Sequence, residues 1–349
     1  MELEGKIKEF LPEEISLTII KNFEEKIKKK PFQSGRGITV YTFSHPRGWG
    51  FAVATLALPF SEELSLGGFR ILPKERIKSE ELFLEKEAAL LAVGMQEKIE
   101  WSKKANIAGP LGQSVLSKLY GGKCVLYPFA GSRVGEPLDF DMLKFACTCL
   151  NALSKGTGIF PVTGQDLGHG TMSDGKTSSL NFLHRNYSGA VTADTSVPTA
   201  AGNFYVVKGA LKAFQIELYD AAVGLIGWGN IGSNLGNFLL KEKASFVVME
   251  AREEKRKRVK ERGIKVFSTE EWEKFFTLPL VAFIFNAQGN SITKDVAELL
   301  CQNAKVKLVT GCENLLLGDP SFSAYFTKAK KLFIPTEYTG MMGYLTAVE

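Results

Sequence analysis

Four short segments in the first half of the chain place polar or charged side chains beside glycines. They are residues 66–70 (Leu-Gly-Gly-Phe-Arg), 101–109, 121–123 (Gly-Gly-Lys) and 163–168 (Thr-Gly-Gln-Asp-Leu-Gly). Their lysines and aspartate suit an amino-acid substrate: one ammonium can bind the α-carboxylate, a second amine with a pKa near neutrality can accept a proton, and the carboxylate can shuttle protons. Any one segment alone is more typical of a surface turn. The prediction of a site therefore rests on the whole set.

A second group of residues centres on 227–232, Gly-Trp-Gly-Asn-Ile-Gly. The uncharged run 221–226 predicts a buried strand, 232–241 has helical apolar spacing, and 245–249 predicts another strand that ends at Glu250. In a dinucleotide-binding fold such glycines permit a tight turn, backbone approach to the pyrophosphate and close helix–strand packing, and an acid about 20 residues further on binds the adenosine ribose. The pattern predicts a nicotinamide dinucleotide site. The alternative is a Rossmann half that binds nothing.

The composition excludes several classes of protein. The chain has 349 residues, which suggests two domains, and 45% hydrophobic with 23% charged residues is ordinary for a soluble globular protein. The densest charged run, 252–262, mixes glutamates with its basic residues and so favours a solvated helix face over nucleic-acid binding. The five cysteines lack metal-ligand spacing and indicate reduced thiols. With no signal peptide or membrane-length apolar run, we expect a cytoplasmic protein without membrane, nucleic-acid or metal partners.

The order of the predicted elements indicates an α/β protein of two domains. We expect residues 1–198 to form an N-terminal substrate domain on a mixed sheet and residues 199–349 a C-terminal Rossmann dinucleotide-binding domain, with the active site in the cleft between them. The expected elements are a largely helical segment over 1–30 ended by Pro31, paired strands over 37–43 and 50–57, a helix over 79–98 with Ser79 as its N-cap, a strand over 121–127, a helix over 140–154, and alternating strands and helices from 221 onward.

Taken together and in this order, the segments resemble the glutamate/leucine/phenylalanine/valine dehydrogenase family, and most of all its leucine dehydrogenase-like members. The resemblance runs from about Gly37 to the C-terminus. It includes residues 198–202 (Pro-Thr-Ala-Ala-Gly), which resemble the family's segment between domains. Residues 286–289 (Asn-Ala-Gln-Gly) and 311–314 (Gly-Cys-Glu-Asn) resemble its loops beside the nicotinamide.

The resemblance implies roles for individual residues. Lys123 matches the catalytic lysine, which would take a proton from the water that attacks an imine, and Asp166 matches the aspartate that moves protons to and from the departing nitrogen. Either Lys104 or Lys98 matches the lysine that holds the substrate carboxylate, and this assignment stays open. The remaining implied residues are Leu66, Gly67, Gly68 and Gly164 for the substrate, and Gly227, Gly229, Asn230, Ile231, Gly232, Glu250, Thr199, Asn286, Ala287 and Asn314 for the cofactor.

The expected reaction is the reversible oxidative deamination of an L-amino acid to a 2-oxo acid and ammonia. NAD is favoured as the cofactor because Glu250 would accept from the ribose hydroxyls and repel a 2′-phosphate, although Arg252 and the basic residues after it leave NADP possible. Glutamate-specific members carry a cation just before the paired glycines, where this chain has Leu66. An unpaired substrate carboxylate would be costly there, so we expect an apolar substrate of the leucine, valine or phenylalanine type.

Two departures from the family keep other hypotheses open. Residues 340–343 (Gly-Met-Met-Gly) stand where the family has Asn-Ala-Gly-Gly, and the sequence stops at Glu349 without the helices that usually follow. The resemblance implies a homo-oligomer, but those helices help to set subunit contacts. One alternative is a homologue that binds dinucleotide without catalysis, since fold does not guarantee function. Another is a biosynthetic enzyme that couples the same imine to a carbon nucleophile.

Overall fold

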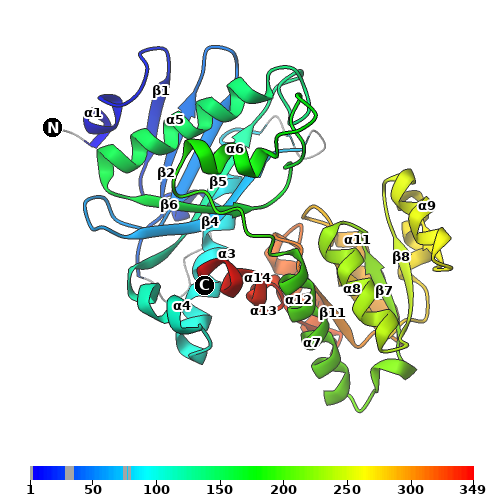
Figure 1. Cartoon of the computed structure of the whole chain (residues 1–349). Helices are drawn as coiled ribbons and strands as arrows, with labels where there is room; N and C mark the ends of the chain where they lie inside the picture. Colours follow the sequence, from blue (N-terminus) through cyan, green and yellow to red (C-terminus); the bar gives the residue numbers. More distant parts are fainter. Residues whose placement is uncertain (1–2, 28–34, 74–76, 78–79) are drawn as a thin grey trace. The chain divides into compact units, whose positions relative to one another are not determined.

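The computed structural model describes residues 3–27, 35–73, 77 and 80–349 (Figure 1). The chain divides into two compact units. The first comprises Met1–Asp194 together with Ala347–Glu349, and the second comprises Thr195–Thr346. Each unit has a six-stranded sheet of its own, so the α/β class predicted from the sequence is confirmed.

The sheet of the first unit is mixed. Strands β2 and β3 pair antiparallel with their neighbours, whereas β4 pairs parallel with both β5 and β6. The strand order is β1 (Ser16–Ile20), β2 (Thr39–Ser44), β3 (Gly50–Thr55), β5 (Leu119–Tyr127), β4 (Leu64–Ile71) and β6 (Phe160–Gln165). Because β4, β5 and β6 run in the same direction, their carboxyl ends meet at one edge of the sheet.

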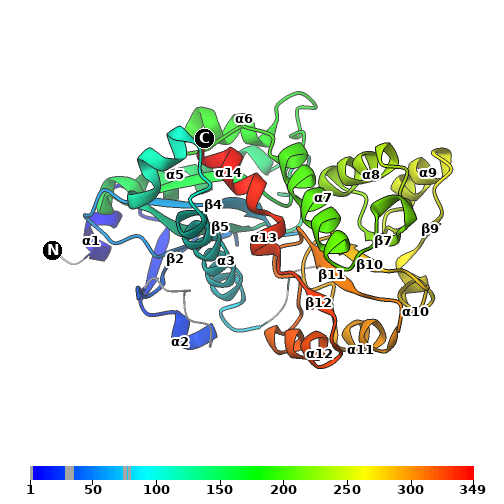
Figure 2. The ribbon, with the colours of Figure 1, turned by 90° about the horizontal axis from the view of Figure 1, so that it is seen from below.

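Two long helices cover opposite faces of this sheet (Figures 1 and 2). Helix α5 (Asp139–Thr157) packs on one face, where Phe69 and Cys124 belong to the main apolar core. Helix α3 (Phe83–Ala105) packs against β5 and β3 on the other face. Side chains alternate along a strand, so Gly68 and Arg70 on β4 lie on the face that α3 covers. The shorter helices are α1 (Leu3–Lys8), α2 (Glu24–Ile27), α4 (Pro110–Val115) and α6 (Ser179–Asn186).

The second unit is a parallel sheet with helices on both faces. Its strand order is β12 (Leu332–Phe333), β11 (Leu308–Gly311), β10 (Ala282–Phe285), β7 (Ala222–Ile226), β8 (Ser245–Met249) and β9 (Val266–Phe267). Read from β9 in chain order this is 3-2-1-4-5-6, the order of a Rossmann fold. Ligands of this fold bind where the order reverses, at the carboxyl ends of β7 and β10.

Each face of the Rossmann sheet has its own apolar core, and Figure 2 shows the helices on the two sides of the sheet. Helices α7 (Ser196–Ala213) and α8 (Asn230–Lys241) pack on one face, and α10 (Trp272–Phe276), α11 (Lys294–Gln302) and α12 (Ser323–Lys328) on the other. Helix α9 (Glu253–Glu261) holds the dense charged run, and its only buried residue is Val259, as a solvated helix face requires. The remaining helices are α13 (Thr336–Thr339) and α14 (Met341–Val348).

The structure corrects two of the predicted elements. The N-terminal segment is not helical throughout, because residues 16–20 form the edge strand β1, which pairs antiparallel with β2. Helix α3 begins at Phe83 and ends at Ala105, later at both ends than the predicted 79–98. The predicted N-cap, Ser79, and the predicted helix end at Pro31 lie outside the described residues.

Two further findings concern the whole of the described chain. No helix in it combines the length and apolar character needed to cross a membrane. All five cysteines are free, and four of them are buried.

Candidate active site

The candidate catalytic residues lie in β5 and directly after β6, on the two sides of β4. Lys123 lies in β5, and Asp166 directly follows β6. Gly68 of β4 pairs with Gly164 of β6. The parallel pairing therefore gathers side chains from three segments that are far apart in the sequence.

A chain of buried charges links these strands to helix α3. The Lys123 Nζ donates to Asp166 Oδ2. Arg70 donates to the same carboxylate from Nε, 3.0 Å from Oδ2, and from Nη2, 3.3 Å from Oδ1. Its Nη1 lies 2.6 Å from Oε1 of Glu87 on α3. Arg70 is 1% exposed and Lys123 is 4% exposed, so water screens these pairs weakly.

Burial and neighbouring charges shift the titration of both candidate catalytic groups. Burial lowers the pKa of Lys123, and the positive charges of Arg70 and Lys98 lower it further, while Asp166 opposes them. Burial alone would raise the pKa of Asp166, but Arg70 first and Lys123 second hold it far below its usual range. The arrangement thus favours an amine that can lose its proton beside a carboxylate that stays ionised.

Two glycines shape the space around the Lys123 amine. A Cβ on Gly68 would lie 2.7 Å from Lys123 Nζ and 3.1 Å from the Asp166 Cβ, so only glycine lets these two side chains occupy their positions. A Cβ on Gly164, by contrast, would meet nothing within 4 Å. Open space therefore adjoins the Lys123–Asp166 pair on the side of Gly164.

The structure distinguishes the two lysines that the sequence left open. Lys98 is buried on α3, with 8% exposure, and its charge acts on Lys123. Lys104 is exposed near the end of the same helix, and its Nζ lies 5.0 Å from the centre of the Trp101 ring. Only Lys98 is therefore close to the cluster of Lys123 and Asp166.

The other predicted substrate residues lie on β4. Leu66 is buried, with 4% exposure, and alternation puts it on the same face as Gly68. Gly67 points to the opposite face, where an added Cβ would lie only 1.8 Å from the Gly122 carbonyl oxygen. The glycine at 67 allows the close approach of β4 to β5 and lies on the face opposite to the Lys123 side chain.

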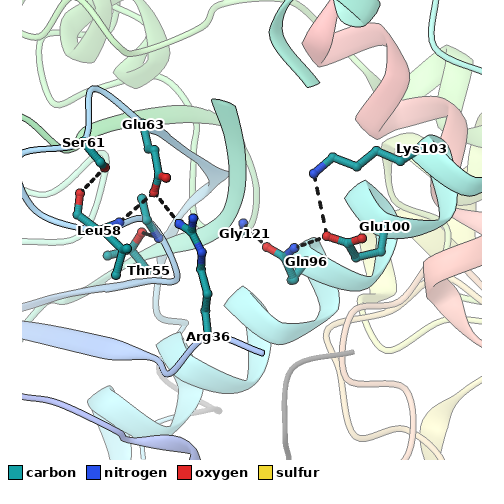
Figure 3. A network of polar contacts seen from close by, with 10 residues as sticks. Arg36, Thr55, Leu58, Ser61, Glu63, Gln96, Glu100, Lys103 and Gly121 are labelled. Carbon is teal, nitrogen blue, oxygen red and sulfur yellow. Dashed lines mark hydrogen bonds and ion pairs between the residues drawn. The ribbon is translucent and has the colours of Figure 1, made fainter. Parts of the chain in front are cut away.

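A polar network fixes α3 against the segment that precedes Lys123 (Figure 3). The Gly121 N–H donates to Gln96 Oε1 at 2.7 Å, and Gln96 Nε2 donates to Glu100 at 2.6 Å. A Cβ on Gly121 would lie 2.5 Å from the carbonyl oxygen of Ala92. The helix thus packs directly on the backbone of β5, which sets the positions of Lys98 and Glu87 relative to Lys123.

Sequence reasoning missed Arg70, Glu87 and His169 as members of this cluster. Arg70 stood inside a segment that was singled out, but it was given no role. Glu87 lies four residues before Leu91 in the predicted helix, so it falls on the apolar stripe, where a charge signals a buried partner. His169 is held by the Phe69 carbonyl at 2.7 Å and the Ser179 hydroxyl at 3.0 Å, and burial lowers its pKa.

The glycine-rich loop of the second unit has the geometry that a pyrophosphate needs. Gly227 has φ +89°, and a Cβ there would lie 2.5 Å from the Asn286 carbonyl oxygen. A Cβ on Gly232 would lie 2.1 Å from the Gly227 carbonyl oxygen. The middle glycine, Gly229, precedes α8 and faces open space, where the nearest atom to an added Cβ is the Lys255 Nζ at 3.9 Å. The partly buried Ile231 and the exposed Asn230 begin the helix.

Glu250 lies directly after β8, with 6% exposure. Its Oε2 accepts from the Trp228 N–H at 2.6 Å and its Oε1 accepts from the Arg252 N–H at 2.9 Å. A carboxylate oxygen has two lone pairs, so each oxygen keeps one for a ribose hydroxyl. Basic groups are also close, because Arg252 Nε lies 3.8 Å from Glu250 Oε1. Burial, followed by the charge of Arg252, lowers the pKa of Lys255.

An unsatisfied amide lies at the point where the strand order reverses. Asn286 follows β10, and its Oδ1 accepts from Asn203 Nδ2 at 3.0 Å and from the Cys312 N–H at 3.2 Å. These two donors determine which end of the amide is oxygen. Its Nδ2 is buried without a hydrogen-bond partner among the described residues, and a buried unpaired donor is costly. A ligand with a carbonyl group, such as the carboxamide of nicotinamide, would satisfy it.

The remaining predicted cofactor residues surround this position. The Ala287 N–H donates to the buried Glu313 at 3.1 Å, and Asn314 is partly exposed. The Thr199 hydroxyl donates to the carbonyl of Thr195, the N-cap of α7, at 2.6 Å, and an added Cβ on Gly343 would lie 2.1 Å from the Thr199 Oγ1. The loop glycines, Glu250 and the unpaired amide of Asn286 therefore fit a nicotinamide dinucleotide.

Comparison with solved structures supports this architecture. The L-tryptophan dehydrogenase of Nostoc punctiforme is 19% identical, with a TM-score of 0.56 over 92% of this chain and 81% of that one. The hetero-hexameric glutamate dehydrogenase of Thermus thermophilus, in a leucine-bound form, is 15% identical, with a TM-score of 0.63 over 99% and 80%. A Plasmodium falciparum glutamate dehydrogenase is 14% identical, with a TM-score of 0.58 over 97% and 70%.

The chain has the fold of the amino-acid dehydrogenases. The resemblance seen in the sequence is thereby confirmed at the level of the fold. No family model matches the sequence, and no curated protein matches it either.

Proposed function

We propose that this protein is a nicotinamide-dinucleotide-dependent dehydrogenase that oxidatively deaminates an apolar L-amino acid to a 2-oxo acid and ammonia. The observation that carries the proposal is the buried Lys123 amine, bonded to Asp166 and adjoining open space at Gly164. A buried lysine of lowered pKa is suited to proton transfer near neutral pH. The fold shared with solved amino-acid dehydrogenases supports the same reaction class.

In this proposal Lys98 binds the substrate and Lys123 transfers protons. Lys98 binds the substrate α-carboxylate, because it is the buried cation whose charge acts on Lys123, whereas Lys104 is exposed. A bound dinucleotide would supply the hydride acceptor for oxidation of the substrate Cα to an imine. Lys123, as the neutral amine, takes a proton from the water that attacks this imine.

We propose NAD rather than NADP as the cofactor. The support is Glu250, whose buried carboxylate retains acceptor capacity at the end of β8 and would repel a 2′-phosphate. Arg252 and Lys255 are the groups that would favour NADP, since both are cationic and lie near the same loop. Titration of each cofactor, followed by protein fluorescence, measures the two affinities. Binding of NADP at least tenfold tighter, about 1.4 kcal/mol, would reverse this choice.

The substrate preference follows from the face of β4 that carries Gly68. Leu66 lies on that face and is apolar, and Gly164 adds space without adding charge. A substrate with a second carboxylate would leave that group without a cation, at a cost of roughly several kcal/mol. Leucine, valine and phenylalanine differ only by a few methylenes, each of which is worth about 1–3 kcal/mol. We therefore propose an apolar substrate without choosing among these three.

The deciding experiment is a spectrophotometric assay of cofactor reduction over a panel of L-amino acids, with ammonia measured as the second product. We expect apolar amino acids to be oxidised and Lys123→Ala to abolish turnover. Lys104→Ala is the matched control, because it removes an exposed lysine and should leave the rate unchanged. Absence of turnover with every amino acid and both cofactors would refute the proposal. So would full activity of Lys123→Ala.

The oligomeric state is a separate part of the proposal. The Thermus thermophilus relative is a hetero-hexamer, and we propose that this chain assembles as a homo-oligomer. Light scattering after size-exclusion chromatography tests this, and a mass of one chain at micromolar concentration would contradict it.

A further inference from the structure

Arg70 is the most completely buried charge of the cluster, and no role has yet been assigned to it. Its guanidinium uses Nε and Nη2 to bond both oxygens of Asp166 and uses Nη1 to bond Glu87. A guanidinium presents its donors in a rigid planar fork, so these bonds fix the orientation of the Asp166 carboxylate as well as its position. Glu87 in turn holds the fork from α3, on the side away from Asp166.

We infer that Arg70, braced by Glu87, is a positioning residue that holds Asp166 as a fixed anion, so that Asp166 stabilises the cationic nitrogen of the substrate and Lys123 alone carries the proton. The inference rests on the proposed function and deepens it. It departs from the role that the sequence resemblance implies for Asp166, which is to move protons to and from the nitrogen.

The two charges that contact Asp166 both favour its ionised form. Arg70 reaches it from β4 and Lys123 from β5. From α3, Lys98 acts through its charge on Lys123, and Glu87 contacts Arg70. The one titratable neighbour on its own segment is His169, whose pKa is lowered by burial and which is therefore neutral at neutral pH.

The balance of charge explains why a fixed anion is useful here. Glu87 and Arg70 cancel one another, which leaves the negative charge of Asp166 for one positive partner. In the structure that partner is the Lys123 ammonium. When a cationic imine occupies the open space beside Gly164, its nitrogen competes for the same carboxylate. The proton on Lys123 is then less stable, so arrival of the cation favours the neutral amine that catalysis requires.

The hydrolytic step then balances with Lys123 as the only protein group that transfers protons. The water oxygen bonds to the imine carbon, the C=N π pair moves to nitrogen, and a water proton moves to Lys123 Nζ. Lys123 next returns this proton to the nitrogen. As the C–N bond breaks, ammonia leaves with the bonding pair, and the hydroxyl proton passes to Lys123 while the C=O bond forms. Asp166 stays ionised throughout and bonds whichever neighbour is cationic.

The test compares the pH dependence of two variants that change the charge beside Lys123 in opposite directions. Arg70→Met removes a cation. In the plot of kcat/KM against pH, the limb that reports loss of the Lys123 proton should therefore move to higher pH by roughly one unit. Asp166→Asn removes the opposing anion, so the same limb should move to lower pH. Arg70→Lys keeps the charge and should return the limb close to its original position while kcat stays below that of the wild type, because the planar fork is lost.

The same titrations are measured without substrate by NMR of labelled lysine and aspartate side chains in the whole protein. The Lys123 resonance should shift as the kinetic limb does, and Asp166 should show no titration between pH 5 and 9. If Arg70→Met is unfolded by circular dichroism, Arg70→Gln, which removes the same positive charge and keeps an N–H donor, takes its place. An unmoved Lys123 titration in Arg70→Met or in this substitute, or an Asp166 carboxyl that titrates in that range, would overturn the inference.

These outcomes separate the inference from the proposed function. Turnover of amino acids with an unmoved Lys123 titration would leave the proposed function standing and refute the role of Arg70. The expected NMR shifts in a protein that oxidises no amino acid would establish the role of Arg70 in holding the pair and refute the proposed function.

Discussion

Gly68 offers the sharpest test of the geometry around Lys123. A Cβ at this position would lie 2.7 Å from the Lys123 Nζ, whereas ordinary van der Waals contact begins at 3.4 Å. In Gly68→Ala the amine must therefore move by about 0.7 Å. The end of a lysine side chain is flexible, so the protein should fold. Misplacement of a catalytic group by about 1 Å can reduce the rate roughly 100-fold.

We therefore expect Gly68→Ala to lower kcat for leucine by roughly 10- to 100-fold, with a thermal midpoint within about 4 °C of the wild type, the shift that roughly 1 kcal/mol produces in a domain of this size. Gly209→Ala is the matched control. It is exposed on α7, and an added Cβ there would meet nothing within 4 Å, so its kcat should be unchanged. Wild-type kcat in Gly68→Ala, with folding confirmed by circular dichroism, would show that the Lys123 amine does not act from this position.

Three further predictions concern substrate and cofactor. Lys98→Ala should raise KM for the amino acid by tenfold or more, about 1.4 kcal/mol, whereas Lys104→Ala should leave KM unchanged. Steady-state kinetics measures both values, and a raised KM in Lys104→Ala with an unchanged KM in Lys98→Ala would contradict the assignment. Leu66→Lys should raise kcat/KM for glutamate relative to leucine by at least about tenfold, because it adds a cation on the face of the sheet that carries Gly68. If the ratio of the two kcat/KM values is unchanged, Leu66 does not face the substrate. Glu250→Ser should weaken NAD binding and strengthen NADP binding in fluorescence titrations, because it removes both the acceptor for the ribose hydroxyls and the repulsion of a 2′-phosphate. An equal loss of both affinities would mean that Glu250 stabilises its loop without contacting the cofactor.

The Rossmann sheet was predictable because each of its signals is local. The uncharged run 221–226 became β7, and the glycines at 227–232 became a turn whose shape only glycine permits. The edge strand β1 was missed for the opposite reason. Its residues, Ser-Leu-Thr-Ile-Ile, are embedded in a charged segment, and Ser16 pairs with Ser44, which is 28 residues away. A strand that depends on a distant partner gives a weak local signal.

The candidate site shows the same division between local and distant information. Lys123 and Asp166 could be selected because each follows glycines within a short motif. The pairs of Arg70 with Asp166 and Glu87 could not, because they join residues that are 96 and 17 positions apart on different elements. Which side chains meet there depends on the order of strands in the sheet and on the placement of α3 against β5. The charged residues can be read from the sequence, but the order of the strands in the sheet cannot be read from any local pattern.

Helix α3 shows why the choice between Lys98 and Lys104 needed the structure. The predicted helix ended at residue 98, which left Lys104 outside it and the choice between the two lysines open. In the structure α3 continues to Ala105 and ends at Asn106 in the left-handed conformation. Both lysines therefore lie on one helix, and a separation of six residues places them about 120° apart around its axis. Lys98 shares the buried stripe of Glu87 and Leu91, at about 20° from Glu87 on the same count. One helix face thus carries both the group that braces Arg70 and the group proposed to bind the carboxylate, so any shift of α3 along the sheet would move both of them relative to Lys123.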